Sequence, residues 1–93
     1  MPRTKHAGKV DLNQAEIVKA LRKAGASVLS LSSLGQGVPD LLVGLGSGLW
    51  MIEVKGPKGT LTPDQIEFID AWPHAVHIAR TPEDALRIVG VLP

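Results

Sequence analysis

Apolar residues recur at helical spacing early in the chain. They share one side of a helix, and they are Ile17, Val18, Leu21 and Ala24. Asp11 has the character of an N-cap, Gln14 suits a capping box with it, and Gly25 stops the run. The pattern therefore predicts a helix over 12–24. Residues 1–10 show no periodicity, so we expect a flexible basic arm there.

Short apolar runs in the middle of the chain predict three β-strands, at 27–32, 40–45 and 49–55. The third run alternates most clearly, and one of its faces carries Leu49, Met51, Glu53 and Lys55. Between the second and third runs, Gly46-Ser47 suits a two-residue type II′ turn, which requires glycine first. We therefore expect an antiparallel hairpin with this turn at its tip.

Two helices and one strand are predicted in the second half of the chain. Thr62-Pro63-Asp64-Gln65 combines a cap, a proline at the first helical position and a capping-box glutamine, and Pro73 ends this helix. A short apolar run at 75–79 predicts a fourth strand, and the Thr81 cap starts a helix over 82–90. The element order is α-β-β-β-α-β-α, which places the chain in the α/β class.

The composition limits what the chain can be. Its 93 residues are enough for one modest core, so we expect a single domain over 11–93. Hydrophobic residues make up 44% and charged residues 20%, as in an ordinary soluble domain. The absence of cysteine excludes disulfides, thiolate metal sites and cysteine nucleophiles. No apolar run reaches the roughly 18 residues of a membrane helix and no secretory signal is visible, so we expect a soluble intracellular protein.

Charge is distributed unevenly, although the net charge is only +1. Residues 1–23 carry six Lys/Arg against two acids, whereas residues 64–93 carry two Lys/Arg against five acids. A basic N-terminal segment suits a polyanion such as nucleic acid, with Lys5 and Lys9 as candidate contacts. The simpler explanation, which charge alone favours, is a solvated tail and helix face.

The predicted hairpin brings two carboxylates together. With Gly46-Ser47 as the turn, Leu45 pairs with Gly48, and the same register places Asp40 directly opposite Glu53. Opposed residues have Cβ atoms about 4.5–5.5 Å apart, and like charges so placed destabilise a sheet. A divalent cation that takes one oxygen from each carboxylate would compensate. Such a cation is the natural candidate, and Mg²⁺ sites commonly use only one or two carboxylates plus water and phosphate oxygens.

Lys55 lies on the same face as Glu53, two residues further and about 7 Å along the strand. An ammonium group there is placed to orient a metal-bound water and to offset phosphate charge. The side chain of Val54 turns toward the core, which leaves its backbone carbonyl as a further oxygen ligand. Asp40, Glu53 and Val54 are therefore the predicted metal ligands, with Lys55 beside them.

These residues also have simpler explanations. Glu53 and Lys55 would form only a weak surface pair if they lay on the solvated face of an edge strand. A three-residue turn would move Asp40 out of register with Glu53. Gln65 satisfies a capping box without any role in a site. Lys58 is a loop lysine of the kind that is usually solvated.

Three motifs, taken together and in order, carry a resemblance to a known family. They are Gly37-Val38-Pro39-Asp40, Glu53-Val54-Lys55 and Leu61-Thr62-Pro63-Asp64-Gln65. With them, the chain resembles the PD-(D/E)xK nuclease superfamily, and within it the stand-alone VRR-NUC domains of phages and prophages. The similarity spans about residues 12–90. It implies a restriction-endonuclease-like core, in which a central mixed sheet is flanked by helices.

The resemblance also implies a role for each site residue. Asp40 and Glu53 match the metal-binding acids, and Lys55 matches the catalytic lysine. Glu16 matches an acid on the first helix that helps to hold a metal or its water. Gln65 matches a glutamine that assists at the scissile phosphate. The implied cofactor is Mg²⁺ or Mn²⁺, and the implied partner is DNA.

The predicted function is that of a metal-dependent endonuclease that cuts branched DNA, such as Holliday junctions, and leaves 5′-phosphate and 3′-hydroxyl ends. Lys58 joins Lys5 and Lys9 as a candidate DNA contact. The resemblance favours a homodimer in the cytoplasm of a bacterium or a phage-infected host cell. Three alternatives stay open: a monomer that nicks DNA or cuts flaps, a DNA-binding module without turnover, and a structural protein with acids on its surface.

Overall fold

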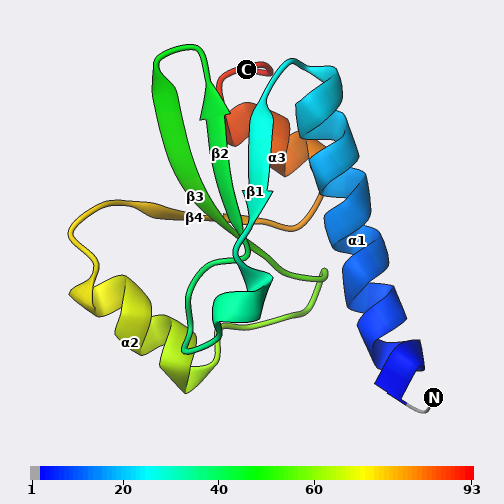
Figure 1. Ribbon diagram of the computed structural model, residues 1–93, viewed down its shortest axis with the longest axis vertical. Coiled ribbons are helices and arrows are strands. Elements are labelled where there is room, and N and C mark those ends of the chain that lie inside the picture. The colour runs from blue at the N-terminus through cyan, green and yellow to red at the C-terminus, as the bar shows by residue number, and fades with distance from the viewer. Residues whose placement is uncertain (1–2) are drawn as a thin grey trace.

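A four-stranded mixed sheet lies at the centre of the computed structural model, which describes residues 3–93, with side chains from residue 12 onward (Figure 1). The strands are β1 (Ser27–Ser30), β2 (Leu41–Leu45), β3 (Gly48–Val54) and β4 (Val76–Ala79), in that spatial order. The β1–β2 and β2–β3 pairs are antiparallel, whereas β4 runs parallel to β3. The predicted α/β order and the mixed sheet are therefore confirmed.

The β2–β3 hairpin has the register predicted from its turn. Its paired residues run from Leu45 opposite Gly48 to Leu41 opposite Ile52. Gly46 has a φ of 58° and Ser47 keeps a negative φ, as a type II′ turn requires. One further step in the same register places Asp40 beside Glu53.

Two helices, α1 (Arg3–Lys23) and α3 (Pro82–Ile88), cover one face of the sheet and enclose the core with it. α1 contributes Ile17 and Leu21, and α3 contributes Ala85, all fully buried. The inward side chains of the strands that meet them are Val28, Leu41, Val43, Ile52, Val54 and Ala79. Alternate residues of the strands thus form the core, as their pattern predicts. Among the described residues, no helix is both long and apolar enough to cross a membrane.

α2 (Pro63–Ala71) stands apart from this core, to one side of the sheet in Figure 1. None of its nine residues is buried. Its start is fixed locally by a complete capping box: the Thr62 hydroxyl accepts from the backbone N–H of Gln65, and Gln65 Oε1 accepts from that of Thr62. The capping box therefore fixes the first turn of α2, which carries Gln65.

The first and last helices differ from their predicted bounds. α1 begins at Arg3, so residues 3–10, expected as an arm, lie within the helix, and Asp11 is not its N-cap. Extending an existing helix adds one hydrogen bond for each residue fixed, so it requires no apolar periodicity. The last helix ends at Ile88 and not at residue 90, because Gly90 adopts the left-handed conformation with a φ of 85°.

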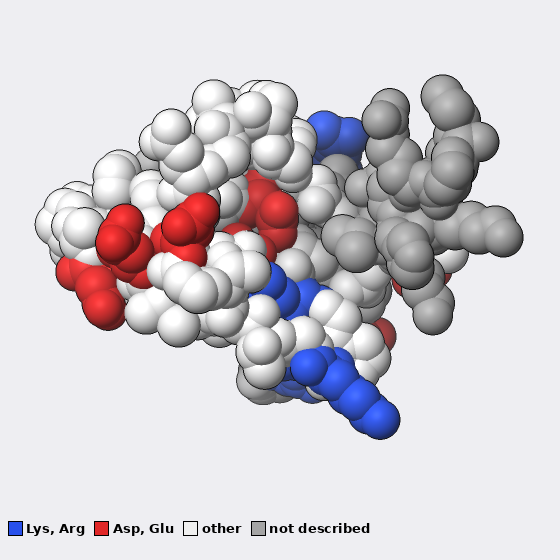
Figure 2. Space-filling view, turned by 90° about the horizontal axis from the view of Figure 1, so that it is seen from below, with Lys and Arg blue, Asp and Glu red and all other residues white. Residues whose placement is uncertain are grey.

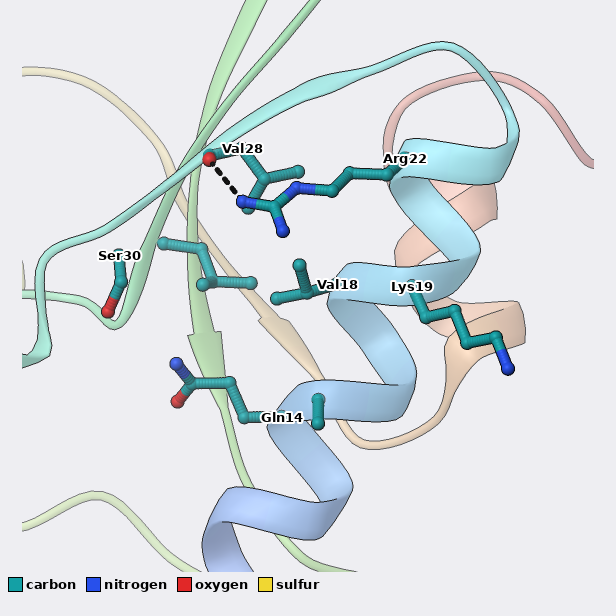
Figure 3. A pocket seen from close by; sticks show the side chains of 8 residues that line it. Gln14, Val18, Lys19, Arg22, Val28 and Ser30 are labelled. Carbon is teal, nitrogen blue, oxygen red and sulfur yellow. Dashed lines mark hydrogen bonds between the residues drawn. The ribbon is translucent and has the colours of Figure 1, made fainter.

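β1 is an edge strand, and a groove of about 560 Å³ separates it from α1 (Figure 3). Arg22 reaches across this groove and donates from Nη2 to the carbonyl oxygen of Val28 at 3.1 Å. This contact occupies backbone that another strand would otherwise pair with. Lys19 points away from the groove. β1 ends at Ser30 and not at residue 32, because the chain turns into a short 3₁₀ helix, η1 (Ser32–Leu34).

Candidate active site

The candidate site forms where β2 begins and β3 ends, two points that lie side by side because the strands are antiparallel. The loop before β2 approaches α2 closely at Gly37, where any side chain would collide with the backbone carbonyl of Asp64. Gly37 also has a φ of 78°, which disfavours side chains. Both demands explain the glycine that opens the Gly37-Val38-Pro39-Asp40 motif. This approach places the first turn of α2 against the loop that leads to Asp40.

Asp40 faces the end of β3. Its Oδ2 accepts a hydrogen bond from the backbone N–H of Val54 at 2.8 Å, and its carbonyl oxygen accepts from the N–H of Leu31 at 2.7 Å. The carboxylate thus takes the place of a backbone acceptor at the end of the β2–β3 ladder. Asp40 is fixed through both its main chain and its side chain, with its charge close to Glu53.

Glu53 is the centre of the site. It is 3% exposed, and it is the one buried charged residue among residues 12–93. Gln65 donates from Nε2 to Glu53 Oε2 at 2.9 Å, and Lys55 Nζ lies 3.7 Å from the same oxygen. Gln65 uses its other amide atom for the capping box, so the same side chain both caps α2 and contacts the site.

Burial raises the pKa of Glu53 to about 7, the nearby Asp40 carboxylate adds to this rise, and Lys55 partly opposes it. At neutral pH this carboxyl group therefore holds a proton more readily than an ordinary glutamate does. A cation beside the pair would replace that proton. The donor set, two carboxylates next to the Val54 backbone, suits Mg²⁺ or Mn²⁺, which prefer oxygen ligands.

Two residues that stand out in no sequence motif fix the surroundings of Lys55. Asn13 of α1 donates from Nδ2 to the carbonyl oxygen of Lys55 at 3.1 Å. Arg80, just after β4, donates to the carbonyl oxygens of Gly56 and Gly59 at 2.6 and 2.8 Å. Both residues bind backbone carbonyls that are distant in sequence, and such contacts leave no signal in residue types or spacing.

Glu16 lies on the α1 side of the site, where it is exposed. It lines a cavity of about 410 Å³ together with Lys55. Among the described side chains, no three His, Cys, Asp or Glu residues gather closely enough to hold a metal ion. The structure therefore brings Asp40, Glu53, Lys55 and Gln65 together, and it leaves Glu16 beside Lys55 but apart from the two acids.

The surface around the site carries charges of both signs (Figure 2). Carboxylates gather over α2, where the exposed acids are Asp64, Glu67 and Asp70. Lys58 is exposed on the turn that follows β3. The side chains of Lys5 and Lys9, the other predicted DNA contacts, lie outside the described residues. Lys58 is thus the one predicted DNA contact that the described part of the chain places near Lys55.

Residues 3–74 match the family model of the VRR-NUC domain. The chain belongs to the VRR-NUC family. The match runs from α1 to beyond the end of α2 and includes every predicted residue of the site. A comparison with curated proteins gives no match. Membership confirms the resemblance to the PD-(D/E)xK nucleases, and it implies a nuclease domain with DNA as its substrate.

Proposed function

We propose that this VRR-NUC protein is a metal-dependent endonuclease that hydrolyses phosphodiester bonds in branched DNA, such as Holliday junctions. Cleavage would leave 5′-phosphate and 3′-hydroxyl ends. One observation carries the proposal: the buried carboxylate of Glu53 lies beside Asp40 and is contacted by Lys55 and Gln65. A buried acid whose pKa is raised by a second acid, and which lies beside a lysine, is more typical of a catalytic site than of a group that stabilises the fold.

Each residue of this cluster has a proposed role. Asp40 and Glu53 would hold Mg²⁺ or Mn²⁺, together with the backbone carbonyl of Val54. When bound, such a cation supplies a Lewis acid and a hydroxide nucleophile at neutral pH. Lys55, with its ammonium 3.7 Å from Glu53, would offset negative charge on the attacked phosphate. Gln65 keeps the Glu53 carboxylate in place through its 2.9 Å hydrogen bond.

Residues at the edge of the site would assist the same reaction. Glu16, exposed in the cavity that Lys55 also lines, would hold a water of the metal ion. Lys58, exposed on the following turn, would contact the DNA backbone together with Lys5 and Lys9. Contacts between lysines and phosphates release counterions, so we expect DNA binding to weaken steeply as salt increases.

We further propose a homodimer, which would present two opposed sites to a four-way junction. The face of the sheet opposite α1 and α3, here the open sheet face, carries Leu29, Leu42, Leu49, Met51 and Ile78. Leu29 is 61% exposed and Leu49 is 69% exposed. A groove of about 690 Å³ joins this face to Trp72 at the end of α2. Apolar surface that the described residues leave uncovered suits a second copy of the chain.

Cleavage of end-labelled four-way junction, flap, splayed and linear duplex DNA in Mg²⁺, Mn²⁺ or EDTA tests the proposed function. We expect symmetric cuts in the junction with either metal and none in EDTA. Salt-sensitive binding without cleavage would identify a DNA-binding module. Flap cutting or nicking by a protein that light scattering shows to be a 9.9 kDa monomer would identify a monomeric nuclease. A protein that neither binds nor cuts DNA would contradict the nuclease hypothesis and the DNA-binding hypothesis alike.

A further inference from the structure

Arg80 lies where β4 meets α3, and its guanidinium binds a turn that is far away in the sequence. Nη1 donates to the carbonyl oxygens of both Gly56 and Gly59, at 2.6 and 2.8 Å. Hydrogen bonds from a charged donor are roughly twice as strong as neutral ones. The ion pairs among the described side chains involve other basic residues, so Arg80 binds this turn without a carboxylate partner.

The turn held by Arg80 packs against Lys55. The N–H of Gly59 donates to the carbonyl oxygen of Gly56 at 3.1 Å, which closes the turn over 56–59. A Cβ atom on Gly59 would lie 3.4 Å from Lys55 Cδ and 3.5 Å from Lys55 Cβ. The backbone at Gly59 therefore lies alongside the aliphatic part of Lys55, whose side chain is only 14% exposed. Displacing the turn would free this side chain to leave Glu53.

Arg80 is itself firmly anchored. Its backbone N–H donates to Asp84 Oδ2 at 2.9 Å, and the N–H of Asp84 donates to the Thr81 hydroxyl that caps α3. The preceding residue, Ala79, is fully buried and accepts from the backbone N–H of Lys55 at 3.1 Å. Lys55 and Arg80 thus directly follow Val54 and Ala79, the paired residues that end β3 and β4, and the Arg80 side chain returns to the turn after Lys55.

We propose that Arg80 is a positioning residue for Lys55: it holds the turn 56–59 against the lysine and keeps the ammonium group beside Glu53. The catalytic part of this proposal rests on the proposed nuclease function. Arg80 lies beyond residues 3–74, the part of the chain that matches the family model. The same two hydrogen bonds fix the turn from which Lys58 projects.

Turnover of a labelled four-way junction in Mg²⁺ tests the proposal with three variants. Arg80→Ala should lower kcat about ten- to hundredfold, because small displacements of a reacting group have costs of this size. KM should change much less than kcat, since Lys58 on the same turn is a single exposed candidate DNA contact. Arg80→Lys keeps the charge, but its ammonium lies closer to the backbone than Nη1 of arginine, so it should recover only part of the loss. Arg87→Ala is the matched control, since the exposed Arg87 pairs with the other oxygen of Asp84, and it should keep the wild-type rate.

The same substitution in a Lys55→Ala background separates positioning from general destabilisation. If Arg80 acts through Lys55, adding Arg80→Ala should cause no further loss of kcat. An equal loss in both backgrounds, or wild-type kcat in Arg80→Ala, would overturn the proposal. Should Arg80→Ala fail to fold, Arg80→Lys replaces it in both backgrounds, and its loss of kcat must likewise disappear when Lys55 is alanine.

Amide hydrogen exchange tests the contact without any cleavage assay. Arg80→Lys, or Arg80→Ala where it folds, should speed exchange at the Gly59 N–H and leave the Lys55 N–H, which is bonded within the sheet, unchanged. Unchanged exchange at Gly59 would overturn the proposal. If the wild-type protein cuts no DNA and the Arg80 variants still show faster exchange at Gly59, the proposed nuclease function fails. The same result would confirm that Arg80 holds the turn.

Discussion

Replacing Glu53 with glutamine probes the electrostatics of the site independently of catalysis. Burial and the Asp40 charge raise the pKa of Glu53 from 4.5 to about 7. The folded protein therefore holds this proton more tightly than the unfolded chain does. The stability that the proton contributes is fully present below pH 4.5 and is lost as the pH rises through 7. The glutamine of Glu53→Gln does not titrate, so the stability of this variant should not fall over the same pH range for this reason.

The size of the effect follows from the two pKa values. The shift of the pKa from 4.5 to about 7 changes the free energy of unfolding by about 3 kcal/mol, at about 1.4 kcal/mol per pH unit. We expect Glu53→Gln to differ little from the wild type at pH 4 and to be more stable by about 3 kcal/mol at pH 8. Mg²⁺ at pH 8 should stabilise the wild type and not the variant, because a cation replaces the missing proton.

Urea denaturation of both proteins from pH 4 to pH 8 in EDTA measures this difference. Groups that titrate alike in both proteins cancel when the two free energies of unfolding are subtracted. Glu67→Gln is the matched control, since Glu67 is exposed on α2, and it should follow the wild type at every pH. A difference between wild type and Glu53→Gln that stays constant, or that shrinks as the pH rises, would refute the reasoning.

Three further predictions test other parts of the structure. Lys55→Ala should lower turnover about a hundredfold or more, with a smaller loss of DNA affinity, as single-turnover cleavage and filter binding will measure. Lys55→Arg should not restore turnover, because a guanidinium is a broad fork and not a compact ammonium. Full activity in Lys55→Arg would indicate plain charge neutralisation. Gly37→Ala should destabilise the fold by more than about 1 kcal/mol in urea, given its φ of 78° and the nearby Asp64 carbonyl, and an unchanged midpoint would contradict that close approach. Leu49→Lys should convert a dimer to a monomer in light scattering, whereas Leu34→Lys, which is outside the open sheet face, should not; a dimer that survives Leu49→Lys would exclude this face.

The central pair of the site can be predicted from sequence because the hairpin that forms it is local. A two-residue turn fixes every later pair, so Asp40 and Glu53 follow from the position of Gly46-Ser47 alone. Gln65 is ambiguous in the sequence because its capping role and its site role call for the same residue type. The structure shows both contacts, one from each atom of its amide.

What the sequence does not reveal depends on contacts between distant segments. Asn13 and Arg80 bind backbone carbonyls, which any residue type offers, so nothing at their target positions indicates them. The start of α1 at Arg3 is set by helix extension, which leaves no apolar pattern. Glu16 has the expected place on α1, but only the packing of α1 decides how far it lies from Asp40.

Cleavage of a four-way junction by wild type and Asp40→Asn most directly tests whether Asp40 and Glu53 form a metal-dependent catalytic centre. Asparagine keeps an oxygen that accepts from the Val54 N–H, so the substitution removes the charge with little change to the fold. Asp70→Asn, an exposed acid on α2, is the matched control. We predict that wild type and Asp70→Asn cut the junction in Mg²⁺, and that Asp40→Asn binds it without cutting. Cleavage by Asp40→Asn at a rate near that of the wild type would contradict this assignment.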